Sequence, residues 1–230
     1  MGLELYARIE PLLGFEEATN ALYDLFIERL AEEKPKSLLD VGCGSGAFLK
    51  RARAALGLKR VEGIDLSEEM VRRAVSAGVP ARAVDVCDAE GTYEAVTAVF
   101  DVLNYLDAEG LRRFMGCVRR YLAPGGLFLA DVNTYFGFEA VGQGALIRQN
   151  GTSLLAMESY FDGERMETVM DLFTKTEAGC YKRESDTVIQ YYHDPARFDE
   201  LDGWRVEEIV PVSLYDEEEA DKWLLVFRAV

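Results

Sequence analysis

The sequence is short of basic residues and of long apolar runs. It has 25 Lys and Arg residues against 41 Asp and Glu residues, and its formal net charge is −16. Because nucleic-acid binding depends on neutralising phosphates with Lys and Arg, this balance disfavours a large RNA or DNA substrate. No apolar run reaches the roughly 18 residues that a membrane-spanning helix needs, so we expect none. An acidic chain suits a cationic or neutral small molecule, or a basic protein segment.

Cysteine and histidine are too few and too scattered to predict a metal site. The cysteines are Cys43, Cys87, Cys117 and Cys180, with no C-x-x-C pair, and His193 is the only histidine. We interpret the cysteines as reduced thiols, neither a zinc site nor a disulfide framework. The chain begins Met-Gly-Leu-Glu-Leu-Tyr, without the basic residues that open a signal peptide. We therefore expect a cytoplasmic protein. The sequence carries no signal for an oligomeric state.

The most informative stretch of the chain reads Leu-Leu-Asp-Val-Gly-Cys-Gly-Ser-Gly-Ala-Phe at 38–48. Its apolar start, Leu38–Val41, predicts a buried parallel strand, and the pattern becomes helical after the last glycine. Between them Gly42, Gly44 and Gly46 let the backbone turn sharply and approach a ligand, because glycine has no Cβ. A strand, a glycine turn and a helix N-terminus together predict a nucleotide-type site.

Two cofactor classes and a purely structural turn compete for this loop. A dinucleotide site has the spacing G-x-G-x-x-G and places a pyrophosphate on the helix N-terminus. Here the spacing is G-x-G-x-G, and Asp40 stands two residues before the first glycine, where a carboxylate would repel a pyrophosphate. The same carboxylate suits a ligand that carries an amino group or another positive charge. The pattern resembles motif I of the class I S-adenosylmethionine (SAM)-dependent methyltransferases.

The resemblance extends over the next three expected strands. Arg60–Asp65 ends in an acid about 20 residues beyond the glycine loop, where a carboxylate holds ribose hydroxyls. After Pro80–Val86 the family places an acid and a backbone N–H on the adenine, and Asp88 is a competitor of Asp85 for that acid. The loop after Tyr93–Phe100 is motif IV, which runs past the sulfonium. The resemblance therefore implies a SAM site made of Tyr6, Asp40, Gly42, Cys43, Gly44, Asp65, Leu66, Met70, Asp85, Val86 and Asp101.

The order of the expected elements predicts the fold class α/β, a Rossmann-like seven-stranded doubly wound sheet with an inserted antiparallel β-sheet. Residues 1–133 and 196–230 would form the SAM-binding domain, and residues 134–195 an insert that covers the substrate. The elements that we expect outside the βα units are a helix at Glu16–Glu33, a helix at Leu111–Leu122, a fifth strand at Gly126–Val132, insert strands at Ser153–Phe161, Arg165–Thr176 and Cys180–Tyr192, a short helix at Pro195–Leu201, and closing strands at Trp204–Val210 and Trp223–Val230.

The insert narrows the resemblance to one branch of the family. Phe100–Leu106, Ala130–Thr134 and the hairpin start Glu158–Asp162 are similar to the small bacterial YqeM-like methyltransferases. In that branch an antiparallel sheet follows the fifth strand and covers the substrate side. The loop around Asp85 departs from the expected pattern, which leaves both loop acids open as ordinary solvated residues.

Methyl transfer from SAM is an in-line displacement, so the protein mainly aligns the reacting groups, and positioning alone contributes about 7–11 kcal/mol. A base is needed only where the nucleophile arrives protonated. The candidates are His193 with the aromatic wall of Tyr192, and Asn104 in the motif IV loop. The competing interpretation is that Tyr191 and Tyr192 alternate across a strand that His193 simply ends.

The predicted function is transfer of a methyl group from SAM to a small-molecule acceptor of unknown identity, for which an amine is one candidate. Two other classes remain open at this point. One is a SAM-binding protein that has lost catalysis and acts as a regulator. The other, which Asp40 and the glycine spacing disfavour, is a nicotinamide (NAD)-dependent oxidoreductase.

Overall fold

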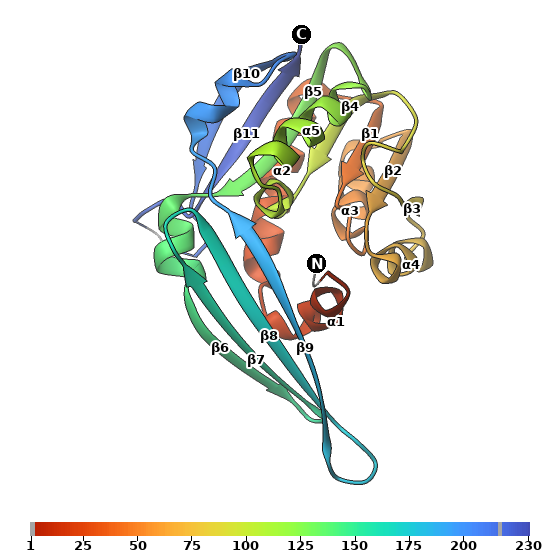
Figure 1. The fold of residues 1–230 in the computed structure, drawn as a ribbon. Helices are drawn as coiled ribbons and strands as arrows, with labels where there is room; N and C mark the ends of the chain where they lie inside the picture. The colour runs from red at the N-terminus through yellow and green to blue at the C-terminus, as the bar shows by residue number, and fades with distance from the viewer. Residues whose placement is uncertain (1–2, 216–217) are drawn as a thin grey trace.

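The computed structural model of the chain describes residues 3–215 and 218–230. Residues 1–2, which enter the expectation of no signal peptide, lie outside the described part. Two sheets organise the molecule, a large one above and a smaller one that projects below it in Figure 1. Within the described ranges, no helix is both long and apolar enough to cross a membrane.

The large sheet has seven strands in the order β10-β11-β5-β4-β1-β2-β3. These are β1 (Ser37–Val41), β2 (Arg60–Asp65), β3 (Ala81–Ala83), β4 (Tyr93–Ala98), β5 (Leu122–Asn133), β10 (Trp204–Val212) and β11 (Lys222–Ala229). The first five are parallel, and β11 runs antiparallel to both of its neighbours. Strand order reverses between β1 and β4, which creates the switch point where open α/β sheets bind ligands. The predicted Rossmann-like fold is confirmed.

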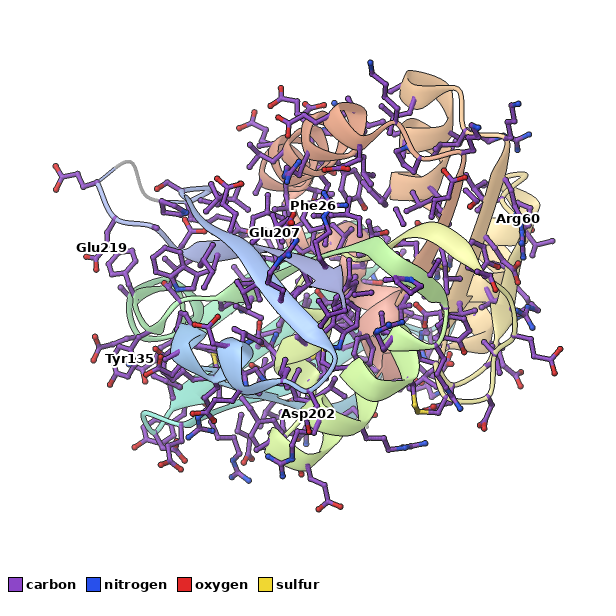
Figure 2. All side chains as sticks on the ribbon, turned by 90° about the horizontal axis from the view of Figure 1, so that it is seen from above. Phe26, Arg60, Tyr135, Asp202, Glu207 and Glu219 are labelled. Carbon is purple, nitrogen blue, oxygen red and sulfur yellow. A yellow bond between two sulfur atoms is a disulfide. The ribbon has the colours of Figure 1, made fainter. Side chains whose placement is uncertain are left out.

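Helices cover both faces of the large sheet. Each helix packs its apolar stripe against the sheet. The helices are α2 (Glu16–Glu33), α3 (Ala47–Leu56), α4 (Glu68–Ser76) and α5 (Ala108–Arg119), with a 3₁₀ turn η3 (Pro195–Glu200). Phe26 of α2 and Phe48 of α3 belong to one hydrophobic core cluster, and Phe114 of α5 belongs to a second one. Figure 2 shows Phe26 inside the molecule and Arg60 at its outer edge. The helix predicted at Glu16–Glu33 is confirmed, whereas α5 ends three residues before the predicted boundary.

The small sheet is antiparallel and has four strands in the order β6-β7-β8-β9. They are β6 (Gly144–Asn150), β7 (Ser153–Phe161), β8 (Arg165–Lys175) and β9 (Tyr181–Tyr191), preceded by a π-helical turn η2 (Gly137–Gly142). The sequence predicts the last three within one or two residues. It misses β6, because most of that strand is exposed and shows no alternation of apolar and polar residues.

Helix α1 (Leu3–Leu13) bridges the two sheets and is absent from the sequence prediction. Its buried side chains Leu5, Ile9 and Leu13, spaced four apart, pack against Leu155 and Met170 of the small sheet. Polar contacts hold the other sides of the helix. Arg8 donates two hydrogen bonds to Glu184 on β9, and Arg73 on α4 donates to the carbonyl of Ala7. The four-residue spacing was the available signal for this helix.

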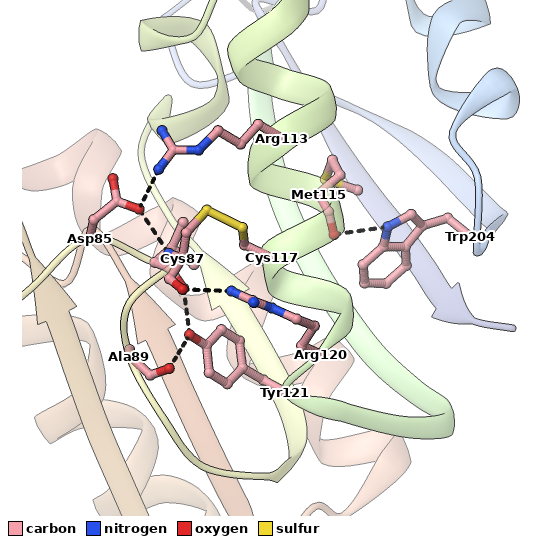
Figure 3. The surroundings of a disulfide bond; sticks show 10 residues. Asp85, Cys87, Ala89, Arg113, Met115, Cys117, Arg120, Tyr121 and Trp204 are labelled. Carbon is pink, nitrogen blue, oxygen red and sulfur yellow. Dashed lines mark hydrogen bonds and ion pairs between the residues drawn. A yellow bond between two sulfur atoms is a disulfide. The ribbon is translucent and has the colours of Figure 1, made fainter.

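The prediction that all four cysteines are reduced is wrong for two of them. Cys87, in the loop after β3, forms a disulfide with Cys117 on α5 (Figure 3). The two are 30 residues apart in sequence, and only the packing of α5 beside the loop brings their Cα atoms to 5.0 Å. Cys43 and Cys180 are free.

Candidate cofactor and methyl-transfer site

One cavity of about 510 Å³ lies at the carboxyl edge of the large sheet, within the size range of small-molecule sites. Its lining comes from α1, α2, the loops that follow β1, β2, β3 and β4, and single residues or pairs from α3, α4 and α5. Ten of the eleven residues predicted to hold SAM line this cavity: Tyr6, Asp40, Gly42, Cys43, Gly44, Asp65, Leu66, Met70, Asp85 and Val86. The remaining residue, Asp101, is not among the lining residues and directly follows the lining residue Phe100 in the sequence.

The glycine loop is fixed by backbone contacts and by close approach to a neighbouring loop. The N–H groups of Gly42 and Cys43 both donate to the carbonyl of Ile64, at 2.8 and 3.0 Å. Gly42 has φ 72°, and a Cβ there would stand 2.7 Å from a methyl carbon of Val102. Any other residue would therefore be strained and would clash. The loop has room for a ligand only because this position is glycine.

Asp40 lies buried at the end of β1, where the hydroxyl of Thr97 donates a hydrogen bond of 2.7 Å to its carboxylate. Burial raises the pKa of Asp40 to about 8, and the Thr97 hydrogen bond only partly opposes this. A ligand that brings a positive charge to this carboxyl would favour its ionised form. The position suits the amino group of SAM and would repel a pyrophosphate.

Asp65 ties together the glycine loop and the start of α4. One carboxylate oxygen accepts the N–H of Gly44 and the other accepts the N–H of Ser67, each at 2.8 Å. Burial raises the pKa of Asp65, although these hydrogen bonds favour its charge. Each oxygen keeps a second lone pair, so the group can still accept from ribose hydroxyls. Leu66 and Met70 line the cavity beside it.

The loop after β3 is held in place from several sides (Figure 3). Asp85 accepts the N–H of Cys87 at 2.8 Å and faces Arg113 at 3.4 Å. The hydroxyl of Tyr121 donates to the carbonyl of Val86, and the disulfide anchors Cys87 to α5. Asp85 and Val86 line the cavity, and Asp88 is not among the lining residues.

The three residues predicted to be catalytic lie away from the cavity. His193 is buried, with Nε2 at 3.0 Å from the carbonyl oxygen of Leu103, and burial lowers its pKa. Tyr192 packs among the aromatic rings of Tyr135 and Phe138. None of the three is among the described lining residues, so this placement gives no support to His193 as a substrate-facing base.

Asn104 has a structural role in this arrangement. Its amide donates to the carbonyl of Tyr191 at 2.9 Å, and its oxygen accepts the N–H of Asn133 at 3.0 Å. It therefore joins the short 3₁₀ turn η1 (Val102–Tyr105) to β9 and to the end of β5. Both polar ends of the side chain are engaged, and the whole residue is buried.

Sequence reasoning missed several polar residues that line the cavity, among them Glu10, Glu16 and Tyr23. Glu10 follows Tyr6 by one helical turn on α1, and burial raises its pKa. Tyr105, which the sequence offered together with Tyr135 as a possible lining residue, does line the cavity beside Tyr6, and burial raises the pKa of both phenols. The four-residue spacing of Tyr6 and Glu10 puts them on one helix face, so the predicted place of Tyr6 at the cofactor was the available signal for Glu10.

Comparisons with known proteins agree with this geometry. A family described as "Methyltransferase domain" matches residues 15–223. A dTDP-4-amino-2,3,4,6-tetradeoxy-D-glucose N,N-dimethyltransferase of Saccharopolyspora spinosa is 31% identical over 133 residues. That match covers 56% of this chain and 53% of the relative, so the chain spans about half the length of this curated relative.

Solved structures share the fold over nearly the whole chain. A SAM-dependent methyltransferase from Clostridium acetobutylicum superposes with a TM-score of 0.78 at 18% identity, covering 99% of this chain and 98% of that one. A SAM-bound amino pentose methyltransferase from Micromonospora echinaspora gives 0.74 at 22% identity, covering 98% and 97%. These comparisons favour neither the silent regulator nor the oxidoreductase. With its glycine loop, its strand-end acids and a family match over most of its length, the chain belongs to the SAM-dependent methyltransferases, and SAM is its cofactor.

Proposed function

We propose that the protein methylates an amino group on a small molecule, with amino sugars as the first class to test. The observation that carries the amine is the charge of the cavity. Its lining includes five acids, of which Asp40, Asp65 and Asp85 are assigned to SAM, so that Glu10 and Glu16 remain for the acceptor. Among the described lining residues there is no lysine or arginine. A site of one charge sign attracts ligands of the other sign. The amino-sugar activity of the Saccharopolyspora relative supports the same class.

The residues divide the work by position. Asp40 and the glycine loop would hold the methionine end, Asp65 the ribose, and Asp85 with Val86 the adenine. SAM, when bound, supplies a methyl group that its positive sulfur has already activated. The protein then has to bring the acceptor into line, exclude water and take a proton from an ammonium that arrives charged. Glu10, one turn from Tyr6 on α1, would contact the acceptor, while Tyr6 stays among the residues proposed to hold SAM.

The test is a transfer assay with matched acceptors. The protein is incubated with SAM and pairs of sugars that differ only in carrying an amino or a hydroxyl group at one carbon. We expect mass spectrometry to find the gain of a methyl group on the amino member of a pair alone. Transfer should rise with pH up to the pKa of the acceptor amine, because only the neutral amine has a free lone pair. Equal transfer to the hydroxyl members would overturn the amine assignment and leave the cofactor assignment intact.

A further inference from the structure

Two consecutive residues in the loop after β4 adopt an unusual backbone conformation. Phe100 and Asp101 have φ of 70° and 63°, and Lys34 is the only other described non-glycine residue with positive φ. A bulky side chain in this region is an outlier, which persists only where surrounding contacts over-determine it. The loop therefore needs a restraint from elsewhere in the fold.

Asp131, fully buried near the end of β5, provides part of that restraint. Its Oδ1 accepts the N–H of Phe100 at 2.6 Å, and its Oδ2 accepts the N–H of Asp101 at 3.2 Å. A carboxylate that receives two adjacent N–H groups fixes the orientation of both peptide units. With both oxygens accepting, the geometry requires the ionised form, although burial raises the pKa of Asp131.

Lys222, the first residue of β11, supplies the counter-charge. Its Nζ donates to Asp131 Oδ2 at 3.1 Å, to Asn133 Oδ1 at 2.9 Å and to the carboxylate of Asp101. These contacts use all three protons of the ammonium. The Nζ also lies 5.4 Å from the centroid of the Phe100 ring, within cation–π range. Burial opposes the charge of Lys222, but the attraction of both carboxylates outweighs burial and raises its pKa.

The restrained loop is also a wall of the cofactor cavity. Val99, Phe100 and Val102 line the cavity, and Val102 is the residue whose methyl group leaves no space for a Cβ at Gly42. A shift of the loop would therefore move the surface on which the glycine loop fits. Lys222, which does not line the cavity, reaches the cofactor site through this chain of contacts.

We propose that Lys222 is a positioning residue for the methyl-transfer site: together with Asp131 it holds Phe100 and Asp101 in the left-handed conformation that shapes the cavity wall. The proposal deepens the function proposed above and rests on its cofactor, SAM, but not on the identity of the acceptor. Removing the ammonium leaves the buried carboxylate of Asp131 facing the half-buried carboxylate of Asp101, which forces the loop away from Asp131.

The test measures binding of SAM and of S-adenosylhomocysteine by calorimetry, together with thermal unfolding. The variants are Lys222→Met, Asp131→Asn and the double variant. We expect Lys222→Met to weaken SAM binding at least tenfold. The double variant should bind SAM more tightly than Lys222→Met, because the amide introduced at position 131 can donate to the carboxylate of Asp101 and one buried charge is gone. Leu225→Ala is the control, because Leu225 is a buried core residue of the same strand and does not line the cavity.

The control separates positioning from general stability. Leu225→Ala should lower the melting temperature but change SAM affinity less than twofold. Wild-type affinity in a folded Lys222→Met variant, losses that simply add in the double variant, or an equal loss in Leu225→Ala would each overturn the proposal. If Lys222→Met does not fold, the double variant should bind SAM within threefold of Asp131→Asn, and an additional tenfold loss would count against it. A wild-type protein that binds SAM but methylates no amine would overturn only the proposed acceptor.

Discussion

The two sheets contribute to the cavity in different ways. The large sheet supplies lining residues directly, from the loops at its carboxyl edge, whereas none of the described lining residues belongs to the small sheet. The small sheet acts through α1, whose apolar face rests on Leu155 and Met170 while Tyr6 and Glu10 face the cavity. The comparison teaches that the insert contacts the cavity wall through α1, and the prediction that it also covers the substrate stays a prediction.

The largest effect should come from the side of the large sheet. Gly42→Val places a side chain where only 2.7 Å separates a Cβ from Val102, on a backbone with φ 72°. We expect a loss of SAM affinity of more than a hundredfold, measured by calorimetry. Gly57→Ala is the matched control, because Gly57 has φ 64° with nothing within 4 Å and lies outside the cavity. It should cost about 1 kcal/mol of stability and leave affinity unchanged. SAM binding by Gly42→Val at the wild-type level would contradict the described site.

The small sheet can be tested at its contact with α1. Leu155→Ala leaves a hole under Ile9 in a fully buried cluster, so we expect a loss of about 2–5 kcal/mol in the free energy of unfolding. SAM affinity should also fall, by a smaller factor than for Gly42→Val, since α1 loses its support. Val169→Ala on the same sheet removes a partly exposed side chain and should change neither quantity measurably. An unchanged SAM affinity in Leu155→Ala would show that the two sheets act independently.

Taken per pH unit, the smallest effect concerns the charge state of Asp40. Its pKa is about 8 in the folded chain and near 4 when unfolded, so between these values the folded state binds the extra proton. Its contribution to stability is therefore complete at low pH and is lost as pH rises toward 8. Relative to Asp40→Asn, the wild-type free energy of unfolding should fall by about 1.4 kcal/mol per pH unit from pH 5 to 7.5. Denaturant titrations at several pH values measure this, and a flat difference would refute the raised pKa.

The sequence predicted most of what depends on local pattern. The glycine loop, Asp65 and the strands that carry them are each encoded within about ten consecutive residues, and all of them lie at the cavity. The restraints on the site escaped prediction because they join distant segments. Lys222 follows Asp131 by 91 residues, and Cys87 precedes Cys117 by 30. Neither spacing has a sequence signature, since only the packing of the strands and of α5 creates these contacts.

His193 is a predicted site residue that the described lining of the cavity does not support. It was a candidate base because it is the only histidine in the sequence and follows two tyrosines. In the structure its ring fills an interior position against Leu103 and Phe198, where burial lowers its pKa. Of the two polar side chains that line the cavity from α1, Tyr6 was predicted from the family resemblance and Glu10 is marked by no motif.

The Cys87–Cys117 disulfide has a thermodynamic consequence for the cofactor. It joins α5 to the loop whose residues Asp85 and Val86 line the cavity. Binding of SAM and closure of the disulfide both act on this loop, so the two equilibria are coupled. Such coupling is reciprocal. Whatever factor the closed disulfide adds to the affinity for SAM, bound SAM must add to the equilibrium that keeps the disulfide closed.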